Sequence, residues 1–144
     1  MGGNSEDALH VALIAAIKAD AGVAAFVGTR VFDWPEPDAA YPFVTVGDIV
    51  SEPHDTDTQE GAMCTVTLHT WANGIAGRVT ARQIGEALCA LLHRKPTALS
   101  VTGHRVVNIT RIFGQVDRDG QGASEGTSLL AHGIYRFRVV TREA

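Results

Sequence analysis

The chain opens with apolar residues at helical spacing. Ser5 is suited to cap a first turn that contains two acids. The apolar positions that follow lie three or four residues apart and are Leu9, Leu13, Ala16 and Ile17. This pattern predicts a helix over about residues 6–19. Asp20 and Gly28 bound a second, shorter helix over residues 21–27, so the sequence predicts a bent helix pair.

The middle of the chain has the pattern of strands. A β-prone run over residues 30–33 leads into a proline-rich surface crossing over residues 34–41, and residues 43–50 and 62–71 predict two strands. The second strand alternates, and one of its faces is formed by Cys64, Val66 and Leu68. Residues 51–61 are too many and too polar for a tight turn, so we expect a long loop in this hairpin.

The strongest helical pattern covers residues 78–94. Its apolar stripe is formed by Ala81, Ile84, Leu88, Leu91 and Leu92. Arg78, Arg82 and Glu86 are spaced four residues apart on another face. The helix is therefore expected to lie on the sheet with its charges outward.

Three further β-prone runs follow, over residues 99–101, 105–113 and 129–141. Between the last two, residues 114–128 are rich in Gly, Asp, Gln and Ser and predict a long mobile loop. The order of elements indicates an α+β fold: a mostly antiparallel sheet with two main helices packed on one face, and long polar loops. We expect one domain over residues 1–144, of which the first four residues are disordered.

Composition favours a folded protein without a basic surface. Hydrophobic residues make up 45% of the sequence and charged residues 19%, and the formal net charge is -4. This charge disfavours dedicated binding to nucleic acid or to anionic lipid. Acids but no Lys or Arg precede the apolar run of residues 11–17, which is too short for a bilayer. We expect neither a secretory signal nor a membrane segment, and a protein kept in the cytoplasm.

The residue types used in catalysis and metal binding do not combine into a site. The six histidines show no ligand spacing such as His-x-x-x-His, and His54 with Asp55 and Asp57 is interpreted as part of a solvated loop. Cys64 and Cys89 are interpreted as buried thiols, one in a strand and one in a helix. The sequence predicts no catalytic residue, no metal and no cofactor, and we expect the protein not to be an enzyme.

Several charged residues remain as candidate contacts with other subunits. The loop over residues 51–61 has no Lys or Arg, and its acids are Glu52, Asp55, Asp57 and Glu60. Arg136 and Arg138 share one face of the last strand with His132 and Ile134. An acidic loop and a basic strand face on one molecule are suited to meet head-to-tail in a ring, whereas the alternative is that both are simply solvated. Further candidate contacts are Asp117, Arg118, Asp119 and Glu125.

Five segments of the sequence resemble one protein family when they are taken in order. They are AGVAAFVGTRVF at residues 21–32, YPFVTVG at 41–47, TVTLHTW at 65–71, GHRVV at 103–107 and GIYRFR at 133–138. Each segment is short, but their order and spacing together are more specific. The chain resembles, from about residue 9 to residue 142, the tail completion (tail terminator) proteins of long-tailed phages and of gene transfer agents.

The resemblance implies a small α+β subunit that forms a hexameric ring on the head-proximal end of the tail tube. Such a ring stops tube polymerisation and joins the tail to the head. The implied partners are further copies of the chain, the tail tube protein and the head-tail connector (stopper) protein, with DNA passing only transiently through the lumen. The protein is then expected in the cytoplasm of the producing bacterium during assembly, and afterwards at the neck end of the particle tail.

Two alternatives stay open from the sequence. A head-closure or other neck protein shares the size and the ring habit, and is distinguished by ring copy number and by binding to the tube protein. A small cytoplasmic enzyme or ligand-binding domain belongs to another class, and it requires a concave pocket with convergent polar groups.

Overall fold

The computed structural model describes residues 5–119 and 130–144. Its first elements are α1 (Ser5–Ala19), α2 (Ala21–Val27), β1 (Val31–Phe32), β2 (Phe43–Pro53) and β3 (Gly61–Asn73). The later elements are α3 (Gly77–Leu92), the 3-10 helix η1 (Pro96–Ala98), β4 (His104–Asp119) and β5 (Leu130–Glu143). The predicted disorder of residues 1–4 lies outside the described residues.

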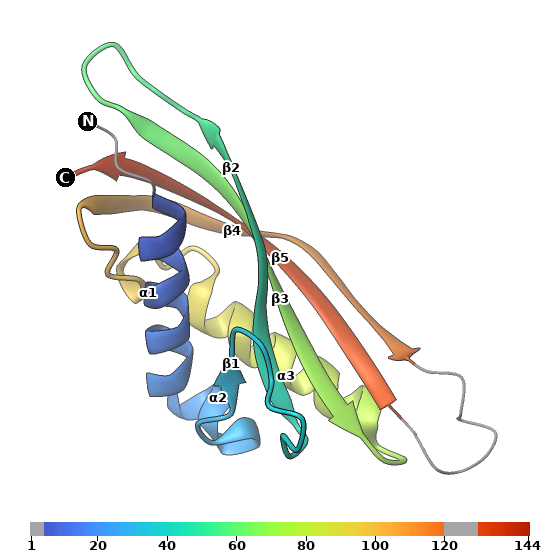
Figure 1. The fold of residues 1–144 in the computed structure, drawn as a ribbon. Helices are drawn as coiled ribbons and strands as arrows, with labels where there is room; N and C mark the ends of the chain where they lie inside the picture. The colour runs from blue at the N-terminus through green and yellow to red at the C-terminus, as the bar shows by residue number, and fades with distance from the viewer. Residues whose placement is uncertain (1–4, 120–129) are drawn as a thin grey trace.

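The strands form one five-stranded sheet in the order β1-β2-β3-β5-β4. β1 pairs with β2 in parallel, and every other neighbouring pair in the described sheet is antiparallel. The three α-helices all lie on the same side of this long, twisted sheet, with α1 toward β2 and α3 across β3, β4 and β5 (Figure 1). The predicted α+β class, the mostly antiparallel sheet and the helices on one face are confirmed.

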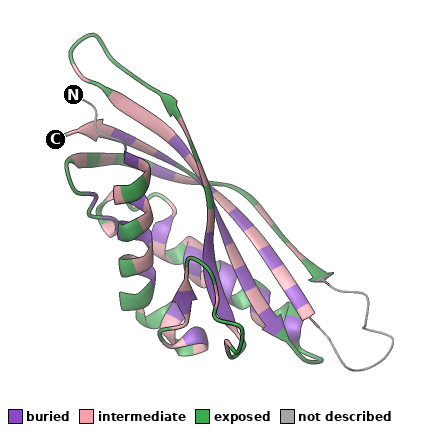
Figure 2. Cartoon of the chain, viewed as in Figure 1, coloured by how far each residue is buried: buried purple, intermediate pink, exposed green. Residues whose placement is uncertain are grey.

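The core lies between this helical layer and the sheet (Figure 2). The apolar spacing in α1 and α3 turns one stripe of each helix toward the strands, and Leu13 and Leu88 are fully buried there. The strands alternate, so Val66 of β3 and Phe137 of β5 are buried against the helices. The stripe predicted for α3 is confirmed, except that Leu91 is half-buried.

The N-terminal helices form the predicted bent pair. Asp20 caps α2 by accepting a hydrogen bond from the backbone N–H of Val23 at 3.0 Å, and Gly28 ends the helix with φ +60°. The two helix axes differ by 79°. No single helix in the described residues is long and apolar enough to cross a membrane, although this bent pair passes that test by length and composition.

Both predicted long loops were partly wrong, because strands continue into them. Residues 51–53 pair with residues 62–64, so the loop between β2 and β3 covers only residues 54–60. Residues 114–119 belong to β4 and pair with residues 130–135. β4 is an edge strand that borders water, and an edge strand tolerates the polar residues that suggested a loop. The rest of the predicted loop, residues 120–128, lies outside the described residues.

The strand predicted for residues 99–101 was also wrong. This segment follows η1 as irregular chain, and its apolar residues Leu99 and Val101 are buried in the core without pairing to a strand. Helix α3 ends at Leu92. Two residues later, Arg94 adopts a left-handed conformation with φ +60° and donates its backbone N–H to the carbonyl of Ile109 on β4. The β-prone residue types of this segment therefore serve to fill the core and do not form a strand.

Candidate assembly interface

The face of the sheet opposite the helices has no covering helix in the described chain, and we call it the open face (Figure 1). Alternation along β5 places His132, Ile134, Arg136 and Arg138 on this face. The residues between them, such as Tyr135 and Phe137, are buried on the helical side. The arginines predicted to share a strand face therefore do so, and that face is available to other molecules.

One register row on the open face is aromatic. Phe43, Trp71, His132 and Asp117 lie opposite one another on β2, β3, β5 and β4. The rings of Trp71 and His132 stack with centroids 3.8 Å apart and an interplanar angle of 7°, and those of Phe43 and Trp71 are 6.2 Å apart. The indole N–H of Trp71 donates to Thr45 Oγ1 at 3.1 Å, which fixes the ring. The rings of Phe43, Trp71 and His132 form a rigid aromatic band across β2, β3 and β5, and Asp117 continues the row on β4.

His132 of this row contacts a second histidine, His69, which lies beside the row. His69 Nδ1 and His132 Nε2 are 2.7 Å apart, a distance at which one ring donates and the other accepts. Burial lowers the pKa of His69, and the neighbouring His132 and Arg136 lower it further, against an opposing effect of Asp48. A Cβ at Gly47 would stand 2.6 Å from His69 Nε2, so glycine is what allows this approach. Burial at this position therefore favours the neutral form of His69.

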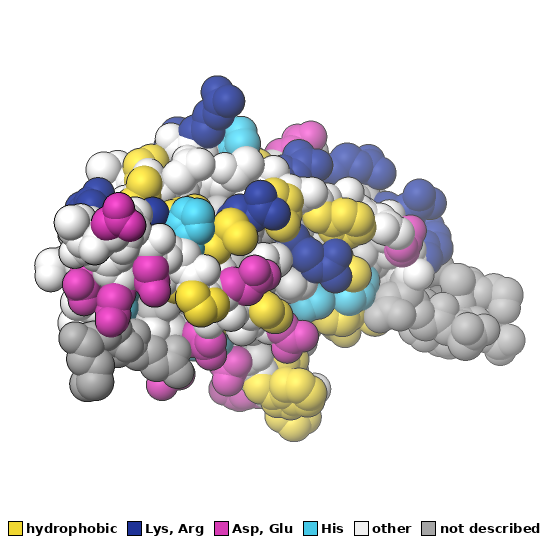
Figure 3. Space-filling model, turned by 90° about the horizontal axis from the view of Figure 1, so that it is seen from above, with side chains coloured by type: hydrophobic (Ala, Val, Ile, Leu, Met, Phe, Trp, Pro, Cys, Tyr) yellow, Lys and Arg dark blue, Asp and Glu magenta, His cyan; other side chains and the backbone are white. Residues whose placement is uncertain are grey.

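Farther along β5 the open face becomes basic. The guanidinium of Arg136 lies 4.9 Å from the ring centroid of Phe113 on β4, and Arg138 is exposed. Phe113 and its neighbour Ile112 are 38% and 40% exposed. Seen from above, the molecule shows Lys and Arg side chains among hydrophobic and His side chains over the sheet (Figure 3). Such a mixture of arginine and exposed apolar groups is typical of contact surfaces.

One group of acidic residues lies at the end of the sheet where the loop of residues 54–60 projects and the C-terminus lies (Figure 1). The loop is held by its own hydrogen bonds: Asp55 accepts from the backbone N–H of Gly61 at 2.9 Å, and Thr56 bonds to Gln59. Arg142 on β5 donates to the backbone carbonyl of His54. These hydrogen bonds give the acidic loop a defined shape and attach it to β5.

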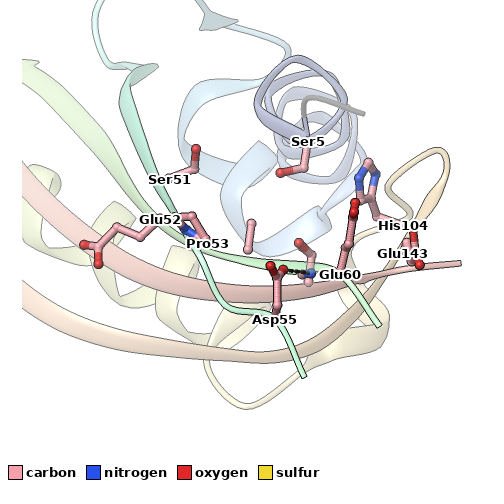
Figure 4. Close-up of a pocket in the computed structure, with 11 residues that line it drawn as sticks. Ser5, Ser51, Glu52, Pro53, Asp55, Glu60, His104 and Glu143 are labelled. Atoms are coloured by element: carbon pink, nitrogen blue, oxygen red, sulfur yellow. Dashed lines mark hydrogen bonds between the residues drawn. The ribbon is translucent and has the colours of Figure 1, made fainter. Parts of the chain in front are cut away.

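A cleft of about 370 Å³ opens beside this loop, between the N-terminus of α1 and the ends of β2, β3 and β5 (Figure 4). Its carboxylates come from Glu52, Asp55, Glu60 and Glu143, and Ser5, His104 and Thr141 also line it. Figure 4 shows the Glu52 carboxylate pointing away from the other acids. The remaining three carboxylates make the cleft negatively charged. We call this feature the acidic cleft.

Within the described residues, these charges form no ion pairs. Among residues 5–119 and 130–144 only one ion pair is closer than 4.0 Å, between His10 and Asp33 at 3.5 Å. Neither the acids of the cleft nor Arg136 and Arg138 take part in it. Two surfaces of opposite charge on different parts of one molecule are complementary between copies of that molecule.

Comparison with known proteins shows which family the chain belongs to. The family model described as Tail completion protein gp17 matches residues 11–142. The chain belongs to this family. A tail completion protein gp17 of Bacillus phage SPP1 is 30% identical over 109 residues, which cover 76% of this chain and 74% of that protein. A chain from the virion of a native gene transfer agent particle superimposes with a TM-score of 0.82 at 22% identity, over 98% of this chain and 99% of that chain.

This tail completion protein is accordingly a structural component of a phage or particle tail, and not an enzyme. Its cysteines agree with that role, because burial raises the pKa of both the Cys64 and the Cys89 thiol and so disfavours the reactive thiolate. Within the described residues, no three His, Cys, Asp or Glu side chains are placed to hold a metal ion. His54, Asp55 and Asp57 are among these residues, so they do not form such a site.

The other candidate contacts of this tail completion protein have different surroundings from those predicted. Asp117, Arg118 and Asp119 lie on edge strand β4, and Asp117 lies opposite His132 on the open face and bonds to Gln115. Arg118 pairs in register with Ala131. Glu125 lies outside the described residues. Sequence reasoning missed the aromatic row. Its available signal was the alternation that puts His69 and Trp71 on one face of β3.

Proposed function

We propose that this tail completion protein forms a closed homo-hexameric ring at the head-proximal end of the tail tube. There the ring ends tube polymerisation and binds the head-tail connector protein, and DNA crosses its lumen without lasting contact. The family match over residues 11–142 carries the proposal. The two surfaces of opposite charge support it, because a head-to-tail contact between unlike surfaces closes into a ring when the rotation between subunits fits.

The net charge of -4 is consistent with a lumen that does not retain DNA. The acidic cleft and the basic part of the open face are separate surfaces, so one can bind a neighbouring subunit while other parts of the surface bind the tube or the connector.

Deletion of the gene tests this function in the producing bacterium. We expect tails of uncontrolled length or tails without heads in electron micrographs, and restored particles when the wild-type chain is supplied. Six copies per tail are expected in assembled particles, since the free subunit need not be oligomeric. Normal particles from a clean deletion would refute the function, and a single copy per tail would refute the ring.

A further inference from the structure

The acidic cleft contains polar groups that the subunit itself does not satisfy. Asp55 is engaged with the backbone of Gly61, but Glu60 and Glu143 have no ion pair among the described residues. The hydroxyl of Thr141, a fully buried residue that lines the cleft, has no hydrogen-bond partner in that part of the chain. A buried hydroxyl without a partner is unusual, and this residue lies in the wall of the cleft.

The arrangement of these groups favours an organic cation over a metal ion. The described carboxylates and imidazoles do not form any group of three that would hold a metal. A guanidinium is larger and planar, and it carries five N–H donors that serve several separated acceptors at once. A cleft of about 370 Å³ lined by carboxylates and a hydroxyl has the size and chemistry for the end of an arginine side chain.

The subunit itself presents arginines of the required kind. Arg138 is exposed in the middle of the open face, where it lies opposite Thr65 of β3 and Thr110 of β4. Gly61 at the cleft is four residues along β3 from Thr65, which corresponds to about 13 Å. The two surfaces are therefore distinct, and Arg138 has no ion pair among the described residues.

We propose that the acidic cleft of one copy receives Arg138 of the next copy, with Glu60 and Glu143 as its ion-pair partners. Phe113, an exposed apolar residue on the open face beside Arg136, helps to exclude water from this contact. The contact joins unlike surfaces, so it repeats around a ring and leaves no cleft unfilled when the ring closes. This inference rests on the proposed ring and names its subunit interface.

Charge reversal on each side tests the contact. Glu60→Arg or Arg138→Glu alone places like charges together at every interface, and we expect the yield of completed tails to fall about tenfold or more. The double variant Glu60→Arg with Arg138→Glu restores opposite charges and should recover most of the yield. Each isolated variant should unfold at a urea concentration close to that of wild type, since both positions are exposed.

Co-expression of the two single variants gives the sharpest result. A Glu60→Arg subunit offers a basic cleft and its normal Arg138, whereas an Arg138→Glu subunit offers its normal cleft and an acidic face. In an alternating ring every cleft then meets an opposite charge, so the mixture should complete tails although neither variant does so alone. Glu36→Arg and Arg78→Glu make the same charge changes at exposed positions outside both surfaces and should leave the yield unchanged.

Three results overturn the inference. The first is wild-type yield from either single variant, and the second is an equal loss of yield in the two control variants. The third is a loss in the single variants that neither the double variant nor co-expression restores. That result would mean that a different protein occupies the cleft. The deletion experiment judges the ring function separately. If deletion blocks tail completion while the single variants behave as wild type, only the proposed interface is wrong.

Discussion

The ring of Tyr135 occupies the space in which a side chain at position 85 would stand. A Cβ built on Gly85 would lie 2.0 Å from Cζ of Tyr135, well inside any contact distance. Gly85 is buried in the middle of α3, and Tyr135 is 4% exposed in the middle of β5. This pair therefore sets how closely the main helix approaches the sheet that carries both proposed contact surfaces.

Gly85→Ala is expected to destabilise the protein. Alanine gains about 1 kcal/mol of helix propensity over glycine, but forcing a methyl group against Tyr135 costs about 1–3 kcal/mol and must displace the ring or the helix. Urea denaturation should show a lower midpoint for Gly85→Ala. In a Tyr135→Ala background the same change should raise the midpoint, because only the helix propensity remains. A raised midpoint in the wild-type background would contradict this reading of the contact.

Gly85 also shows where sequence reasoning reaches its limit. Local patterns were sufficient for α1, α2, α3 and β3, because caps and periodic apolar residues depend on neighbours in the chain. From the sequence, Gly85 is only a residue of low helix propensity within a predicted helix. Its partner Tyr135 lies on the last strand, and no local pattern connects the two.

The candidate interface was predictable only where it depends on residues that are close in the sequence. Alternation along one strand placed Arg136 and Arg138 together, and the acids of the β2–β3 loop are adjacent in sequence. The aromatic row depends on the register among β2, β3 and β5, which one sequence does not determine. The extension of β4 to Asp119 depends on pairing with β5, whose contribution outweighs the weak β propensity of Gly114 and Asp117.

Cys64→Ser tests the structural role of the buried thiol. Cys64 is fully buried on β3, with Ser5 Oγ 3.9 Å from its Sγ, and burial raises its thiol pKa. A hydroxyl there is a poorer fit to an apolar site, so the free energy of unfolding should fall by about 1–3 kcal/mol while tail completion persists. Cys89→Ser, at a half-buried position, should cost less. A folded Cys64→Ser protein that fails to complete tails would indicate a chemical role for the thiol.

Asp20→Ala removes the side-chain cap of α2. The carboxylate of Asp20 accepts the hydrogen bond from Val23 at the start of this seven-residue helix, and loss of such a cap costs about 1 kcal/mol. Thermal unfolding should show a lower Tm for Asp20→Ala and a nearly native Tm for Asp20→Asn, which keeps a capping oxygen. Equal losses in both variants would mean that the charge, rather than the cap, matters.

His69 should make the fold sensitive to acid. Burial and the nearby His132 and Arg136 hold the pKa of His69 below its ordinary 6.5, and Asp48 only partly opposes them. Between the folded and unfolded pKa values the unfolded chain binds more protons, so stability rises with pH in that window and is lost as pH falls through it. Urea midpoints from about pH 5 to pH 7 should therefore rise in wild type and rise less in His69→Gln. His54→Gln, in the exposed loop, is the matched control and should keep the wild-type slope; an unchanged slope in His69→Gln would assign the acid sensitivity to other groups.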